Sequence, residues 1–270
     1  MVRAAWVTVV CVGTALLAGC NAEPRHEAFA ASTGEKATGF LDKAAPLDGK
    51  AARYALYVPE DYTAEKAWPL IVFLHGSGER GNDNLKQTDE GIGHAIRLHR
   101  DRFPALVLMP QCPDGAFWDK AVPAIEAAMA QVQAEYNVDP KAITLTGLSL
   151  GGYATWIWGA AKTDTFAALM PICGGGNPAD VLGKMDEKEA ARFGTMEERV
   201  KALSTVPIWA FHGADDDVVP PERSREMVKA VKDAGGDVKY DELKDTNHNS
   251  WDAAYGDEKA IKWLLKQRKK

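Results

Sequence analysis

Cysteine, histidine and an excess of positive charge are all scarce or missing in this chain of 270 residues. It has four cysteines, six histidines and a net charge of −6. His75, His212 and His248 show no paired ligand spacing, so we expect neither a metal nor any other cofactor. Nucleic-acid-binding proteins favour a basic patch, which this negative balance does not support. The composition therefore points away from metal chemistry and from nucleic-acid partners.

A long hydrophobic run is lacking too, because the apolar stretch Val7–Leu17 is too short to span a bilayer comfortably as a helix. With a basic residue before it, this stretch predicts a secretory signal peptide over residues 1–19. The ending Leu-Ala-Gly-Cys resembles a bacterial lipoprotein box, which would make Cys20 a lipidation site; the alternative is an ordinary signal with a chance cysteine. Asn21 in place of Asp implies, by that analogy, release from the inner membrane. We expect an extracytoplasmic, lipid-anchored bacterial protein, periplasmic or associated with the outer membrane, with residues 20–37 as a flexible tether.

The rest of the chain alternates strand-like and helix-like segments. Its apolar content of 46% is ordinary for a globular protein with a real core. The strand-like runs are Ala52–Val58, Leu70–Leu74, Ala105–Met109, Ala142–Thr146, Ala167–Pro171, Ile208–Phe211 and Val238–Leu243. The helix-like runs are Gly91–Leu98, Val122–Tyr136, Gly152–Ala161, Pro221–Ala234 and Glu258–Lys266. This alternation predicts one α/β domain over residues 38–270, with a mostly parallel central sheet and helices on both faces.

The segment Gly147–Gly152, with the sequence GLSLGG, stands between a strand-like run and a helix-like run. A Gly-x-Ser-x-Gly turn in this place is the nucleophile elbow of a serine hydrolase, which lifts the hydroxyl of Ser149 out of the sheet. The alternative is a glycine-rich turn with an incidental serine, and the flanking strand and helix favour the elbow. We therefore predict Ser149 as the nucleophile and the backbone N–H of Leu150 as an oxyanion donor.

A serine nucleophile needs a base, and the base needs an orienting acid. Where this turn supplies the serine, the acid and then the histidine follow it in the chain. Two histidines lie downstream, His212 and His248, and only His248 comes after an acid on a loop beyond a strand, Asp216. We expect Asp215 and Asp217 to be solvated turn carboxylates, and His212 to pack behind the site. The predicted triad is Ser149, Asp216 and His248.

A second oxyanion donor is expected from the loop after the third strand of the fold. Pro69–Leu74 is a continuous apolar run of the buried parallel type, and His75–Gly78, with the sequence HGSG, follows it. Small residues here allow close approach of the backbone to a bound carbonyl. We assign the N–H of Ser77, with Gly76 as the neighbour that could replace it; the alternative is a plain glycine-rich turn.

Taken together, these stretches resemble the α/β-hydrolase superfamily, in its branch of esterase D-like, polyhydroxybutyrate depolymerase-like and feruloyl esterase-like proteins. Members of this branch are also described as predicted peptidases or prolyl oligopeptidase-like hydrolases. The resemblance implies an acid four residues after the histidine of His-Gly-x-x-Asp, which selects Asp216. It runs from about Thr38 to Leu265. Its matching stretches are Tyr54–Pro59 with Asp61 and Tyr62, Pro69–Gly81, Met109–Pro113, Gly147–Gly152, Pro171–Gly176, Trp209–Pro220, and His248–Trp251 with Tyr255.

The chain departs from this pattern between Asn177 and Ser204, where a long charged stretch predicts a small cap over the site. The strand order that the resemblance implies also bears on Cys112 and Cys173. It sets the strands before them three positions apart, roughly 14 Å at about 4.8 Å per step. A disulfide needs Cα atoms within about 7 Å, so we expect none between these two residues.

The leading interpretation is a serine carboxylic ester hydrolase that forms an acyl-enzyme on small acyl or aromatic esters, of acetyl or feruloyl type, either free or linked to polysaccharide. A serine peptidase of prolyl oligopeptidase-like type is the second, although we expect no room for a propeller domain. A non-catalytic binding lipoprotein is the third. Trp118 and Trp251 are predicted to flank the substrate, Trp118 from an exposed turn; the alternative for each is a core tryptophan. The oligomeric state stays open, with a monomer as the default.

Overall fold

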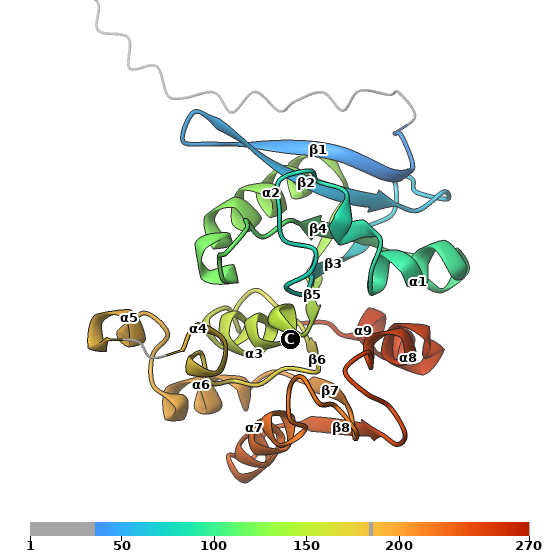
Figure 1. Cartoon of the computed structure of the whole chain (residues 1–270). Helices are drawn as coiled ribbons and strands as arrows, with labels where there is room; N and C mark the ends of the chain where they lie inside the picture. The colour runs from blue at the N-terminus through green and yellow to red at the C-terminus, as the bar shows by residue number, and fades with distance from the viewer. Residues whose placement is uncertain (1–35, 184–185, 270) are drawn as a thin grey trace, which may run out of the picture. The chain divides into compact units, whose positions relative to one another are not determined.

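The described part of the chain is built around a central sheet of eight strands (Figure 1). The computed structural model describes residues 36–183 and 186–269. The predicted signal peptide, Cys20 and residues 21–35 of the predicted tether lie outside these residues. The strands are β1 (Gly39–Leu47), β2 (Lys50–Val58), β3 (Trp68–Leu74), β4 (Leu106–Pro110), β5 (Val138–Leu148), β6 (Leu169–Ile172), β7 (Ile208–Gly213) and β8 (Val238–Leu243). They lie in the order β1-β2-β4-β3-β5-β6-β7-β8.

Two of the neighbouring strand pairs, β1–β2 and β2–β4, are antiparallel, and the pairs from β4 to β8 are parallel. The predicted mostly parallel sheet is therefore confirmed, and each of the seven predicted strands is present. The strand β1 was not predicted, because its sequence GFLDKAAPL lacks a regular alternation of apolar and polar residues. A two-residue loop joins β1 to β2, in which Asp48 and Gly49 have φ values of 48° and 75°. Positive φ at both positions is what a type I′ hairpin turn requires.

Helices cover both faces of the sheet. Successive strand residues point to opposite sides, so an apolar strand places apolar side chains on both faces, and each face has to be covered. In β3, Leu70 and Val72 face one hydrophobic core, while Ile71 and Phe73 face the other. The first core is closed by α2 (Val122–Glu135), α3 (Leu150–Ala161), α6 (Met196–Leu203) and α7 (Glu222–Asp233). The second is closed by α1 (Ile92–Leu98), α8 (Trp251–Gly256) and α9 (Glu258–Lys266). Three short 3₁₀ turns, η1 (Lys86–Thr88), η2 (Arg100–Arg102) and η3 (Trp118–Lys120), lie in the connections.

The charged stretch 177–204 is mostly helical where the structure describes it. It contains α4 (Ala179–Leu182), α5 (Glu187–Ala191) and α6, which lie beside α3 in Figure 1. Thr195 and Glu198 form a capping box that starts α6, and the buried Arg199 donates hydrogen bonds to Phe193 O at 2.9 Å and Gly194 O at 2.7 Å. These bonds fix the chain between α5 and α6. That this stretch acts as a cap stays a prediction.

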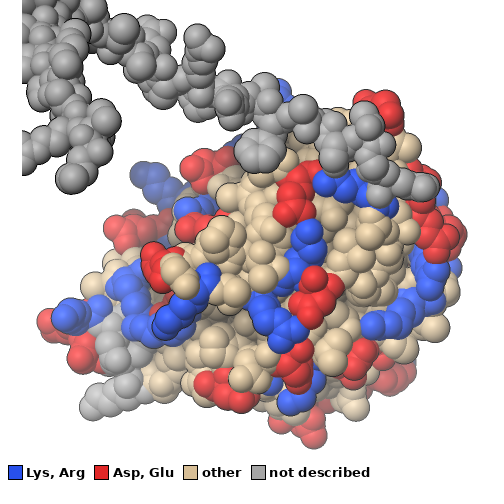
Figure 2. Space-filling model, turned by 90° about the horizontal axis from the view of Figure 1, so that it is seen from above, with Lys and Arg blue, Asp and Glu red and all other residues tan. Residues whose placement is uncertain are grey.

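Acidic and basic side chains are interspersed on the face shown in Figure 2, without a broad field of one sign. This is the side on which Figure 1 draws β1 and β2. Within residues 36–183 and 186–269, none of the helices is long and apolar enough to cross a bilayer.

Candidate active site

The turn at Ser149 joins β5 to α3 with a strained backbone. Ser149 has φ 51° and ψ −114°, a conformation that non-glycine residues seldom adopt. Its N–H donates to Ile172 O at 3.0 Å, which ties the turn to the end of β6. A Cβ on Gly147 would lie 2.5 Å from Gly151 O, and one on Gly151 would collide with Leu74 O. The two glycines are therefore needed because the elbow is packed against backbone on both sides.

The hydroxyl of Ser149 begins a chain of three side chains. Its Oγ lies 3.0 Å from His248 Nε2, and His248 Nδ1 lies 2.7 Å from Asp216 Oδ2. The other carboxylate oxygen, Asp216 Oδ1, accepts hydrogen bonds from Val218 N–H and Val219 N–H, each at 2.9 Å. Because the buried carboxylate accepts from Nδ1–H, Nε2 is left as the acceptor for the serine hydroxyl. The structure thus brings together the three residues predicted as a triad, from the loops that follow β5, β7 and β8.

His212 contacts the same carboxylate oxygen as His248, a role that sequence reasoning missed. It is fully buried, and its Nε2 lies 3.1 Å from Asp216 Oδ2 and 2.9 Å from Val219 O. Its Nδ1 lies 2.7 Å from Ser224 Oγ. Burial lowers the pKa of His212, which favours a neutral ring. Asp216 is therefore held by two backbone amides and two imidazoles, while Asp215 and Asp217 are exposed as predicted. The spacing of His212 and Asp216 by four residues was the signal for this contact.

A second buried histidine, His75, fixes the loop that carries the predicted oxyanion donors. Its Nε2 accepts from Cys112 N–H at 2.9 Å, so Nδ1 carries the proton and donates to Gly76 O at 2.6 Å. Burial lowers the pKa of His75 to about 4, so the ring is neutral near pH 7. Gly76 is buried and Ser77 is exposed. Sequence reasoning gave His75 no role, because its partner Cys112 lies 37 residues away.

Trp118 also meets this loop, and the prediction that it lies on an exposed turn is wrong. Its side chain is 1% exposed, because η3 turns the ring inward against His75 at a centroid distance of 4.7 Å. Its Nε1–H donates to His75 O at 3.2 Å. Trp251 differs, since it is half-buried at the start of α8, 5.5 Å from the ring of His248, and donates to Glu90 Oε2 at 3.4 Å.

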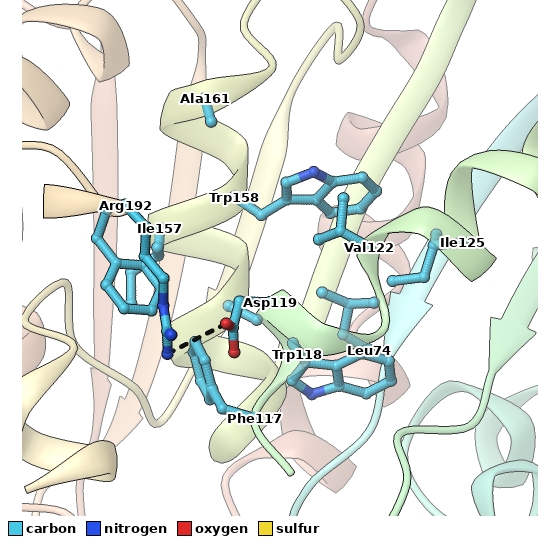
Figure 3. A pocket seen from close by; sticks show the side chains of 12 residues that line it. Leu74, Phe117, Trp118, Asp119, Val122, Ile125, Ile157, Trp158, Ala161 and Arg192 are labelled. Carbon is cyan, nitrogen blue, oxygen red and sulfur yellow. Dashed lines mark ion pairs between the residues drawn. The ribbon is translucent and has the colours of Figure 1, made fainter. Parts of the chain in front are cut away.

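A cavity of about 280 Å³ opens between α2, α3, η3 and the end of α5 (Figure 3). In Figure 3 the rings of Trp158 and Trp118 lie on opposite sides of it, and most of its other walls are apolar. Two charged side chains, Asp119 and Arg192, form an ion pair at 3.2 Å on its lining. Leu74, the last residue of β3 before the His75 loop, also contributes to the wall. The cavity therefore reaches the segment that leads into the predicted oxyanion loop.

The described residues show neither a metal cluster nor a disulfide. No three side chains of His, Cys, Asp or Glu gather there as metal ligands would. Cys112 and Cys173 are free thiols, and the strands before them, β4 and β6, are three positions apart in the sheet as the resemblance implied. Cys173 Sγ instead accepts a hydrogen bond from Ser149 N–H at 3.3 Å.

Comparison with known proteins supports these observations. The sequence model described as "Prolyl oligopeptidase family" matches residues 119–269, which include all three side chains of the hydrogen-bonded chain. A solved crystal structure of a thermostable esterase is 34% identical, with a TM-score of 0.71, covering 85% of this chain and 63% of that one. The fold is thus the α/β-hydrolase fold that was predicted.

Two curated relatives are more distant. The bifunctional acetylxylan esterase/xylanase XynS20E of Neocallimastix patriciarum is 27% identical over 183 residues, 66% of this chain and 23% of that protein. Poly(3-hydroxyalkanoate) depolymerase C of Paucimonas lemoignei is 26% identical over 206 residues, 66% of this chain and 48% of that protein. The chain therefore spans less than half the length of these two relatives.

Proposed function

The chain belongs to the prolyl oligopeptidase family, and we propose that the site at Ser149 hydrolyses carboxylic esters through an acyl-enzyme. The observation that carries the proposal is the unbroken chain of contacts from Ser149 Oγ through His248 to the buried Asp216. The likeness to an esterase structure at 34% identity supports ester over amide substrates.

In the proposed reaction, Ser149 Oγ bonds to the ester carbonyl carbon while His248 Nε2 takes the hydroxyl proton. Asp216 holds the imidazole through Nδ1 and stabilises its charged form. When the tetrahedral intermediate collapses, the alcohol leaves with the proton from His248 Nε2. Water then attacks the acyl-enzyme by the same route and releases the acid, which restores Ser149.

The oxyanion of each intermediate needs two N–H donors, and we assign those of Leu150 and Ser77. Leu150 begins α3, where amides have no partner within the helix. Gly76 O is turned toward the ring of His75. In a trans peptide the next N–H points the opposite way, so the N–H of Ser77 is turned away from that ring. The N–H of Gly76 is the weaker choice, because a backbone hydrogen bond from Gly76 lowers the pKa of Glu79 against the raising effect of burial.

We assign the apolar cavity beside Trp118 to the acyl group of the substrate, and the half-buried Trp251 to the site mouth. Aromatic walls favour an apolar or aromatic acyl group of moderate size. The esters could be free small molecules or linked to polysaccharide, as the name of the acetylxylan esterase relative suggests.

A peptidase is the second candidate, because the family is named after prolyl oligopeptidase. A paired assay separates the two: hydrolysis of p-nitrophenyl acetate and butyrate beside cleavage of a proline p-nitroanilide. We expect ester turnover to exceed anilide turnover by orders of magnitude. Faster anilide cleavage would make the protein a peptidase, and no turnover of either would support a non-catalytic binding protein.

We also propose that Cys20 is lipidated and holds the protein at a membrane outside the cytoplasm. The support is the lipobox-like sequence before Cys20. Each buried CH₂ of an acyl chain contributes about 0.8 kcal/mol, so two or more chains hold a protein firmly. Cys20→Ser should move the protein from the detergent-extracted membrane fraction to the soluble one. A wild-type protein that is wholly soluble would contradict the anchor.

A further inference from the structure

Glu79 is a carboxylate beside the nucleophile that the reaction above does not use. It follows the HGSG loop, and its side chain is 16% exposed. Its Oε2 is buried and has no hydrogen-bond partner. Buried polar atoms are nearly always paired, so an unpaired carboxylate oxygen in a site points to a group that arrives with a ligand.

The free oxygen borders the same space as the nucleophile. A Cβ placed on Gly76 would lie 3.1 Å from Glu79 Oε2 and 3.6 Å from Ser149 Cβ. The nearest atom to that position is Leu148 Cδ1 at 2.8 Å, so the carboxylate and the serine are neighbours across Gly76 and the tip of Leu148. A substrate bound for attack by Ser149 therefore lies close to this carboxylate.

The surroundings stabilise the charge of the carboxylate only through the backbone of Gly76 and of Glu79 itself. His75 Nδ1 lies 3.9 Å away, but the ring is neutral near pH 7 and donates to Gly76 O. The guanidinium of Arg80 is bonded to Ser77 O at 3.0 Å and to Ala116 O at 3.3 Å. Burial has the largest effect and raises the pKa of Glu79; the backbone hydrogen bond from Gly76 lowers it in part, and the charge of Glu90 raises it further. A bare carboxylate here would oppose the negative charge that develops on the substrate oxygen.

We propose that Glu79 recognises a hydrogen-bond donor, a hydroxyl or an ammonium group, that the substrate carries next to its scissile carbonyl. This inference rests on the proposed ester hydrolysis and names its substrate class: esters of 2-hydroxy or 2-amino acids rather than of plain alkanoic acids. The donor group pairs with Oε2 and screens the reacting oxygen from its charge. Glu79 acts in this as a specificity-determining residue.

Three ethyl esters of nearly equal shape test the proposal: ethyl lactate, ethyl alaninate and ethyl isobutyrate, which place OH, NH₃⁺ and CH₃ at the same position. Acid release is followed in a pH-stat on the full-length protein. Because the α-OH and α-NH₃⁺ groups also activate the carbonyl, each kcat/KM is divided by the rate constant of hydroxide-catalysed hydrolysis of the same ester. We expect this normalised value in the wild type to be roughly 10-fold or more higher for the first two esters than for isobutyrate, the size of a charge-assisted hydrogen bond.

Two variants separate charge from hydrogen bonding. Glu79→Gln keeps an acceptor oxygen, so the lactate-to-isobutyrate ratio should be largely kept while the alaninate-to-isobutyrate ratio falls. Glu79→Leu should bring both normalised ratios to about one. Glu60→Gln is the matched control, because it removes the same charge from an exposed pair with Arg100, and its ratios should equal those of the wild type. Melting temperatures of all variants check that each is folded.

Equal normalised kcat/KM values for the three esters in the wild type, or normalised ratios that survive in Glu79→Leu, would overturn the role of Glu79 while ester hydrolysis stands. If none of the esters, p-nitrophenyl acetate included, is hydrolysed, the proposed function fails and this inference fails with it.

Discussion

At the scale of single residues, Ser149 holds its backbone where a residue with a Cβ is strained. Strain of this kind costs about 1–3 kcal/mol. We expect Ser149→Ala to abolish activity by several orders of magnitude without changing the melting temperature, because alanine bears the same strain. Ser149→Gly should be equally inactive but melt a few degrees higher, since glycine adopts φ near 51° freely.

Ester turnover and a thermal melt of both variants test this. A Ser149→Gly variant that melts below Ser149→Ala would show that the turn stores no strain. Ester turnover near the wild-type rate in either variant would show that another residue is the nucleophile.

Asp216 is the buried member of three successive aspartates, and only its carboxylate reaches His248. Asp216→Asn should lower kcat by roughly 10⁴-fold, since an amide cannot hold the imidazole in the required tautomer. Asp215→Asn and Asp217→Asn serve as matched controls and should change kcat by no more than a few-fold. Similar losses at all three positions in a steady-state ester assay would indicate that the loop itself had been disturbed.

Chain order and spacing were enough to predict that Ser149, Asp216 and His248 come together, because each follows a strand whose carboxyl end meets the same edge. The roles of His75 and His212 could not be read in this way. Each depends on which backbone groups of distant loops surround the ring, such as Cys112 N–H. Trp118 was placed wrongly because its polar neighbours describe the loop surface, whereas the direction of the ring depends on η3.

At the scale of elements, periodicity predicted the buried strands well and the edge strand β1 not at all. Central parallel strands are covered on both faces and are almost wholly apolar, as in β3. The strand β1 lies at the sheet edge and is mostly half-buried or exposed, so its apolar pattern is weak. Its turn, Asp48–Gly49, was the stronger signal, since Asp-Gly favours a type I′ hairpin.

The helix α3 links Ser149, the proposed nucleophile, to the cavity, because it starts at Leu150 and lines the cavity from Ala154 onward. Ala154→Leu should fill part of the space and lower the ratio of kcat/KM for butyryl over acetyl p-nitrophenyl esters by roughly 10-fold, the scale set by one or two methylenes in an apolar pocket. Leucine favours the helix as alanine does. A parallel loss for both esters at an unchanged melting temperature would exclude the cavity as the acyl site.

At the scale of the whole molecule, the two buried neutral histidines link stability to pH. The pKa of His75 is lowered to about 4 and that of His212 is also lowered, while an unfolded histidine titrates near 6.5. The unfolded chain therefore takes up protons first, and stability falls as pH drops below about 6.5. For His75 the loss continues to about pH 4 and amounts to about 2 kcal/mol between pH 7 and pH 5.

Urea unfolding at pH 7, 6 and 5 measures this loss, with His212 adding to it. The window avoids most of the carboxylate titration, which lies lower. A free energy of unfolding that stays constant across these pH values would mean that neither ring has a lowered pKa in the folded protein.

The two described thiols lie deep in the domain, and burial raises the pKa of Cys112 and of Cys173 to about 12. Thiolates, not thiols, react with alkylating reagents and oxidants. Neither sulfur can therefore be modified while the native structure is closed. The rate of alkylation at each position, mapped by peptide mass spectrometry, therefore measures how often the surrounding structure opens. Cys112 reports on the His75 loop, and Cys173 reports on the turn at Ser149. Different alkylation rates at Cys112 and Cys173 would show that one of these two regions opens locally more often than the other.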